Sequence, residues 1–177
     1  AGIAADDMAV ITTAQMAGFK ATQMAALTTT QASNLTSAQI KAMTAAQLTG
    51  LTTAQVSVLA TAGLAGLTTA QTAGLTTAQL SALTSDQVKS LTSAQLAGLR
   101  ANQVVGFETA DLAQMSTTQL AGLTSVQLAG LTTSQVVAMT TEQVTNLTTT
   151  QLANLSAKQL ASMETADLAA ITTTNIT

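Results

Sequence analysis

The residues in this chain that are best suited to chemistry are three pairs of acids. The pairs are Asp6 with Asp7, Glu108 with Asp111, and Glu164 with Asp167. Carboxylates three residues apart share one face of a helix and could bind Ca²⁺ weakly. Acids at the start of a short helix also cap it and complement its dipole, and this is the interpretation that we favour. We therefore predict no catalytic, cofactor-binding or metal-binding residues.

The composition removes the side chains that most enzymes use as nucleophiles and general bases. His, Cys, Tyr and Trp are absent from the chain. Ser and Thr are abundant, but none has a His or a distinctive Lys beside it that would activate the hydroxyl. Without Cys there are no disulfides and no thiolate metal sites. The sequence predicts a protein that is not an enzyme and that needs no cofactor.

The low charge argues against two classes of partner. Charged residues make up 7% of the chain, and the net charge is −3. Scattered cations cannot follow a phosphate backbone, and no aromatic residues are placed to stack on bases, so we expect no nucleic-acid binding. No apolar run approaches the roughly 20 residues of a membrane span, so we expect no membrane insertion.

The sequence contains two further patterns that could act at the protein surface, one for glycosylation and one for binding ice or polysaccharide. Four Asn residues match the N-glycosylation sequon, which the repeat described next generates by itself: Asn34, Asn146, Asn154 and Asn175. Paired Thr residues could form outward-facing ladders that suit ice or polysaccharide. One hydroxyl of each pair is, however, expected to cap a helix. We keep both chemistries as minor alternatives.

The whole chain from Gly2 to Thr177 is one eight-residue unit, repeated 22 times without insertion or deletion. With Gly2 at position one, position two is always Leu, Ile, Met or Phe, and position four is always Ala, Ser or Thr. Position six is Gln in 17 octads, position seven is large and apolar in 20, and position one is Gly in nine. Ala32 and Thr72 are the exceptions at position seven. This regularity predicts a single array over residues 2–177.

A short helix that restarts in every octad explains the pattern. In a continuous helix each octad would be rotated by about 80° from the last, so the apolar positions would not form a stripe. In a strand, positions two and seven would face opposite sides. Thr or Ser at position three and Gln at position six form the S/T-x-x-Q capping box, as in Thr76 and Gln79. We predict a helix from position four to position eight, with positions two and seven facing inward.

The predicted fold is an all-α solenoid with one short capped helical turn per octad. All acids lie at positions three, five or six, near the helix start, and Lys41 and Lys89 lie at position eight, near its end. Gly or Asn at position one predicts a left-handed helix C-terminus. A β-solenoid with two octads per coil is the alternative, because short Thr-rich repeats occur in such folds. The hand and the number of octads per turn stay open.

One octad cannot bury enough apolar surface to fold without its neighbours, so stability must come from contacts between successive turns. The small residue at position four indicates that a neighbouring turn or another chain packs closely there. Solenoids usually end in polar caps, yet the last octad, AITTTNIT, is as apolar as those in the middle. We therefore expect either a longer array or chains that stack end to end, with the protein itself as its main partner.

The unit LTTAQLSAL, from Leu75 to Leu83, resembles the octapeptide arrays of very large proteobacterial surface and secreted proteins. The resemblance covers the entire chain and implies an extracellular or cell-surface scaffold, filament, sheath or stalk. Such proteins are often described as adhesins or haem-utilisation proteins, but the chain has no His, Cys or Tyr that could ligate haem. We expect a self-assembling structural protein, or alternatively an adhesin stalk, spacer or binding module.

Overall fold

The computed structural model describes residues 4–171 and contains one short helix in each octad of that range. The first is a 3₁₀ helix and the other twenty are α-helical, with no strand among the described residues. The predicted all-α solenoid is confirmed, and the β-solenoid is not formed. The helices are η1 (Asp6–Val10), α1 (Thr13–Ala17), α2 (Ala21–Ala25), α3 (Thr29–Ser33), α4 (Ser37–Ala42), α5 (Ala45–Gly50), α6 (Thr53–Val56), α7 (Thr61–Ala65), α8 (Thr69–Gly74), α9 (Thr77–Ser81), α10 (Ser85–Ser90), α11 (Ser93–Ala97), α12 (Ala101–Val104), α13 (Thr109–Gln114), α14 (Thr117–Ala121), α15 (Ser125–Ala129), α16 (Thr133–Val137), α17 (Thr141–Thr145), α18 (Thr149–Ala153), α19 (Ala157–Ser162) and α20 (Thr165–Ala170).

The helices begin where the capping box predicts. In α11 the N-cap is Thr92 and the N3 residue is Gln95, so the helix starts at position four of its octad. The Gln95 amide N–H donates to Thr92 Oγ1 at 3.2 Å, and the Thr92 N–H donates to Gln95 Oε1 at 2.7 Å. Each reciprocal pair satisfies two backbone or side-chain groups that a free helix start would leave to solvent.

The predicted left-handed helix C-terminus is wrong. No described residue has a positive φ, and the C-cap Gly98 remains right-handed at φ −75° and ψ −12°. The following position-two residue is extended instead, as for Leu91 at φ −67° and ψ 137°. Two extended residues, at positions two and three, carry the chain from one helix to the next. The chain therefore turns without the conformation that would require glycine.

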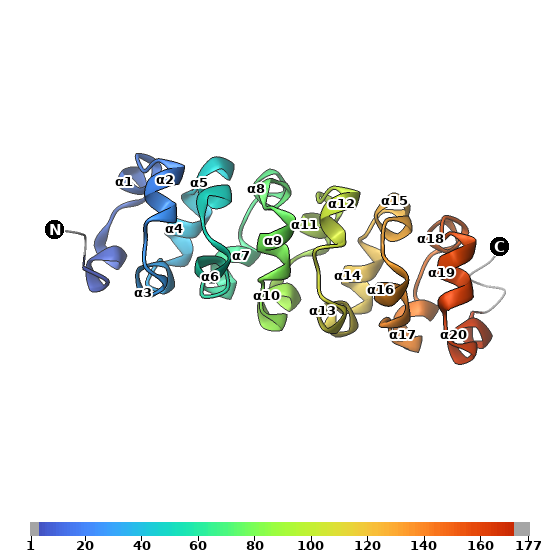
Figure 1. Cartoon of the computed structure of the whole chain (residues 1–177). Helices are drawn as coiled ribbons and strands as arrows, with labels where there is room; N and C mark the ends of the chain where they lie inside the picture. The colour runs from blue at the N-terminus through green and yellow to red at the C-terminus, as the bar shows by residue number, and fades with distance from the viewer. Residues whose placement is uncertain (1–3, 172–177) are drawn as a thin grey trace.

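Three octads make one coil of the solenoid. Each helix from α1 to α17 packs against the helix three further along the chain, as α2 does with α5 and α5 with α8. The coils stack along one axis, and the colour in Figure 1 runs steadily from blue to red along it. The solenoid is therefore one-dimensional: a coil is stabilised by the coils before and after it.

The core is a column of side chains from positions two and seven. Position-seven side chains from Met8 to Val144 are 0–1% exposed, and position-two side chains from Leu35 to Leu147 are 2–5% exposed. The irregular position-seven residues, Ala32 and Thr72, are also buried. Thr72 satisfies its hydroxyl by donating to the Thr68 carbonyl at 3.1 Å. The inward face predicted from the sequence is confirmed.

Glycine at position one allows successive coils to approach closely. A Cβ on Gly50 would lie 2.5 Å from the Ala21 carbonyl oxygen, and one on Gly122 would lie 2.6 Å from the Ser93 Cβ. Ala21 and Ser93 both occupy position four, so a neighbouring turn is what packs against that small position. At Gly50, Gly106 and Gly122 glycine thus serves close approach and not backbone freedom, since no described glycine has a positive φ.

Candidate functional site, a ladder of glutamine amides

The glutamine at position six connects each coil to the coil before it. The first turn of the helix holds Gln95 beside its N-cap, where Oε1 accepts the Thr92 N–H. The amide nitrogen points the other way. Nε2 donates to the Leu64 carbonyl at 2.8 Å and to the Leu67 carbonyl at 2.9 Å, both in the preceding coil. Leu64 lies in the last turn of α7, and its carbonyl accepts the Leu67 N–H at 3.1 Å as well.

The same arrangement recurs along the stack, with one acceptor 28 residues earlier in the chain and the other 31 or, for Gln71, Gln103 and Gln135, 30 residues earlier. Examples are Gln47 with Met16 and Phe19, Gln79 with Leu48 and Leu51, Gln127 with Leu96 and Leu99, and Gln159 with Leu128 and Leu131. These four glutamines are 2–3% exposed. Each side chain caps the start of its own helix and also bonds backbone carbonyls of the preceding coil. We call this series of position-six glutamines the glutamine ladder. A buried amide with every polar atom bonded stabilises and specifies the packing.

Gly63 is one of the described position-six residues that is not glutamine. A Cβ at Gly63 would lie 2.5 Å from Ile40 Cδ1, so the Ile40 side chain occupies the space next to that backbone. The N-cap of this helix is Ala60, which has no side-chain cap. The ladder is interrupted here, and apolar packing takes its place.

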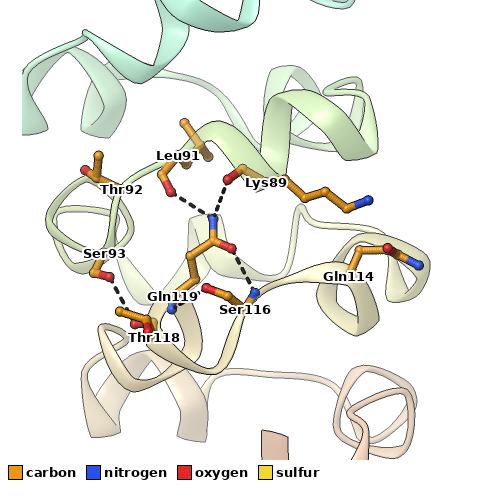
Figure 2. Close-up of a pocket in the computed structure, with 8 residues that line it drawn as sticks. All are labelled: Lys89, Leu91, Thr92, Ser93, Gln114, Ser116, Thr118 and Gln119. Carbon is orange, nitrogen blue, oxygen red and sulfur yellow. Dashed lines mark hydrogen bonds between the residues drawn. The ribbon is translucent and has the colours of Figure 1, made fainter.

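The groove between successive coils forms an open hollow of about 540 Å³. Figure 2 shows Gln119 on its floor, with Nε2 donating to Leu91 at 2.8 Å and Oε1 accepting the Ser116 N–H at 2.9 Å. The Ser93 hydroxyl donates to the Thr118 carbonyl at 3.0 Å. The Gln119 amide and the Ser93 hydroxyl that line this hollow are therefore already bonded to protein. The drawn arrangement can hold coils together and contains no group set up for acid–base or nucleophilic chemistry.

In two of the three acid pairs one acid is exposed and the other is buried. Glu108 is the exposed N-cap of α13, but its side chain makes no cap hydrogen bond. Asp111 is 4% exposed and accepts the Ser85 hydroxyl at 2.7 Å, from the coil before it. The predicted capping by Glu108 is wrong. A short carboxylate at position six cannot donate to the carbonyls that glutamine reaches, so it accepts the hydroxyl at position four instead.

The Glu164 and Asp167 pair repeats this arrangement. Glu164 makes no side-chain cap in α20, and buried Asp167 accepts the Thr141 hydroxyl at 2.7 Å. Asp6 and Asp7 are exposed in the first turn of η1, beside a helix start with no side-chain cap. Within residues 4–171 no three acids, histidines or cysteines group where they could hold a metal ion.

Three of the four sequon asparagines use their side-chain nitrogen within the fold. Asn34 Nδ2 donates to the Ala5 carbonyl at 2.9 Å, Asn146 Nδ2 to the Glu142 carbonyl at 2.8 Å, and Asn154 Nδ2 to the Thr150 carbonyl at 2.8 Å. This is the atom that a glycan would modify. Asn175 lies outside the described residues. In the same range no helix is both long and apolar enough to cross a membrane.

The sequence predicted one of the two roles of the position-six glutamine, the helix cap, but not its bonds to the preceding coil. The spacing from Thr92 to Gln95 predicts the cap, which is a local hydrogen bond. The bonds to Leu64 and Leu67 join residues that only the three-octad coil brings together. One signal could have revealed them: Glu serves equally well in a capping box, yet no octad has Glu at position six. A requirement for an amide donor explains that choice.

The comparisons identify the repeat unit. A family model described as the ALTTAQ repeat matches residues 56–93 and 104–141. No curated protein and no solved structure matches the chain. The octapeptide repeat inferred from the sequence is therefore confirmed, and the two matched segments are tandem ALTTAQ repeats.

Proposed function

We propose that this chain is a structural repeat protein that self-assembles into a filament, sheath or surface scaffold. The observation that carries the proposal is the glutamine ladder. Glutamine amides bond coil to coil along the stack, from Gln39 on Met8 and Ile11 to Gln159 on Leu128 and Leu131, with breaks only at Gly63 and Asp111. An interface that repeats from coil to coil along one axis extends without limit, as in head-to-tail assemblies that do not close.

An extracellular or cell-surface location is part of the same proposal. Its support is the resemblance of the repeat unit to octapeptide arrays of bacterial surface and secreted proteins. The low charge of the chain also favours association, since little electrostatic repulsion keeps copies apart.

Light scattering and electron microscopy over a concentration series would test the assembly. We expect the mass-average size to rise with concentration and rod-like particles of constant width to appear. A strictly monomeric protein at the highest concentrations reached would overturn the proposal.

A stalk or spacer is the second candidate. It is favoured by the one-dimensional stack in Figure 1, in which the first and last described coils lie at opposite ends. Such a rod holds whatever is attached at one end away from the other. Small-angle scattering of a dilute sample would show an elongated monomer in both cases. Only the structural filament would lengthen as the concentration rises.

A further inference from the structure

The open hollow between successive coils carries a lysine and a glutamine at its edge. Lys89 lies at position eight, in the last turn of α10, and its charge is the only one among the residues that line the hollow. Asp86, three residues earlier on the same helix, is not one of those residues. Gln114, the last residue of α13, is the only glutamine at position one of an octad. Figure 2 shows Lys89 and Gln114 at one side of the hollow and Ser93 and Thr118 at the other.

A matched groove two coils earlier shows what Gln114 does to the lysine. Lys41 is also at position eight, in the last turn of α4, and Gly66 stands where the later groove has Gln114. A Cβ on Gly66 would lie 1.7 Å from Lys41 Cε and 2.6 Å from Lys41 Nζ, so the Lys41 side chain lies across the Gly66 backbone. Gln114 has a Cβ at the equivalent place. Lys89 therefore cannot take the Lys41 conformation, and it lines the hollow instead.

Two hydroxyls of the hollow also lack a counterpart in the earlier groove. Ser116 Oγ accepts a backbone N–H at 3.1 Å, which leaves its hydroxyl hydrogen to donate, and Thr118 is exposed. In the earlier groove Thr68 already donates its hydroxyl to its own capping glutamine at 2.8 Å, and Ala70 stands in place of Thr118. Only the later groove combines a cation, an exposed amide and two hydroxyls.

We propose that this hollow binds a hydroxylated carboxylate, with a uronic acid unit as the ligand class. The Lys89 ammonium group donates to the carboxylate, and the Gln114 amide and the hydroxyls of Ser116 and Thr118 bond the sugar hydroxyls. A single cation suits one negative charge, whereas phosphate groups are commonly held by Arg residues or by several backbone N–H groups.

The size and position of the hollow fit such a ligand. Its volume of about 540 Å³ lies in the range of small-molecule sites, and its open shape suits one unit of a longer polysaccharide chain. The residues that line it belong to interior coils. Binding there goes beyond the proposed self-assembly and does not depend on it.

Saturation-transfer NMR of the purified 177-residue chain with galacturonic acid would test the site, with galactose as the neutral analogue. We expect saturable binding of galacturonic acid with a Kd on the order of 1 mM, and weaker binding of galactose, because few groups hold the ligand in an open site. No saturable binding of galacturonic acid would overturn the proposal. Its displacement by an equal concentration of inorganic phosphate would indicate a general anion site and overturn the sugar assignment.

Lys89→Gln and Lys41→Gln form a matched pair, since each removes one lysine from position eight of an octad. Lys89→Gln should weaken galacturonic acid binding roughly fivefold and remove the preference over galactose, because it removes the charge that pairs with the carboxylate. Lys41→Gln should bind as the natural chain does. Equal titrations of the two variants would contradict the site.

Gln114→Gly tests the position-one side chain while Lys89 stays in place. It recreates the Gly66 arrangement, so Lys89 can lie across the backbone, and binding should fall as it does in Lys89→Gln. The reverse change, Gly66→Gln with Ala70→Thr, displaces only the far end of the Lys41 side chain and should add a second binding event per chain. Circular dichroism would check that both variants are folded. A folded Gln114→Gly variant that binds like the natural chain, or a folded reverse variant with no added binding, would overturn the role given to Gln114.

Discussion

At the scale of single residues, one glutamine side chain forms hydrogen bonds with three backbone groups in two coils. Gln95 accepts from Thr92 and donates to Leu64 and Leu67, and its side chain is 2% exposed. Its loss affects a helix start and a coil junction together. Glutamine is thus the polar residue on which this fold depends most.

Gln95→Glu should destabilise the protein by about 3 kcal/mol, because a buried carboxylate would face two carbonyls without donors. Thr92→Ala loses only the cap, at about 1 kcal/mol, and Leu91→Ala should cost about 2–5 kcal/mol as a core truncation. Chemical denaturation of the three variants would measure these free energies of unfolding. A Gln95→Glu variant no less stable than Thr92→Ala would show that the bonds between coils contribute little.

Two serines at position four provide a matched pair. Ser85 donates to the buried Asp111 carboxylate, whereas Ser93 donates to the Thr118 backbone carbonyl. Ser85→Ala should lower the free energy of unfolding by about 2 kcal/mol, since hydrogen bonds to charged groups are the stronger kind. Ser93→Ala should lower it by about 0.5 kcal/mol, a smaller effect than that of Thr92→Ala. Equal losses would mean that the Asp111 carboxylate is satisfied in another way.

At the scale of helices, the coil spacing depends on residues without a side chain. Gly50→Ala places a Cβ 2.5 Å from the Ala21 backbone oxygen and should push α5 away from α2, with a fall in melting temperature. Gly18→Ala is the control: its only close neighbour is its own Gln15 carbonyl, at 3.2 Å. Alanine is favoured over glycine in a helix by roughly 0.5–1 kcal/mol, so Gly18→Ala should be neutral or stabilising. Thermal unfolding followed by circular dichroism distinguishes the two, and equal effects would contradict close coil packing.

At the scale of the whole molecule, the unit that can be removed is the coil of three octads. Deleting residues 90–113 lets Gln119 reach the Leu64 and Leu67 carbonyls that Gln95 now bonds. Gly122 and Gly130 then take the places of Gly98 and Gly106. The shortened chain should keep its helical circular dichroism spectrum and unfold cooperatively at a similar or slightly lower temperature.

Deleting residues 90–101 provides the contrast. This removes one and a half octads, so every later helix loses its register against the coil before it. We expect loss of helical signal and of cooperative unfolding in the same measurements. A half-octad change that is tolerated as well as the whole coil would show that the ladder does not set the register.

The sequence by itself determined where most helices begin and which side chains face inward. The spacing of Thr92 and Gln95 fixed the helix start, and the apolar residues at positions two and seven fixed the inward face. These are local hydrogen bonds and local amphipathicity, which a single repeat displays. The family match to the repeat agrees with that level of description.

Only the tertiary structure decided how octads meet. Three octads per coil follow from the angles of the extended residues between helices, such as Leu91, which no residue type dictates. That geometry brings Gln95 to Leu64, Asp111 to Ser85 and Gly122 to Ser93. It also explains why glycine at position one was misread: a left-handed turn and a close approach both favour the residue without a Cβ. Only the contacts between coils show which of the two explanations applies, and these contacts join residues more than twenty positions apart in the sequence.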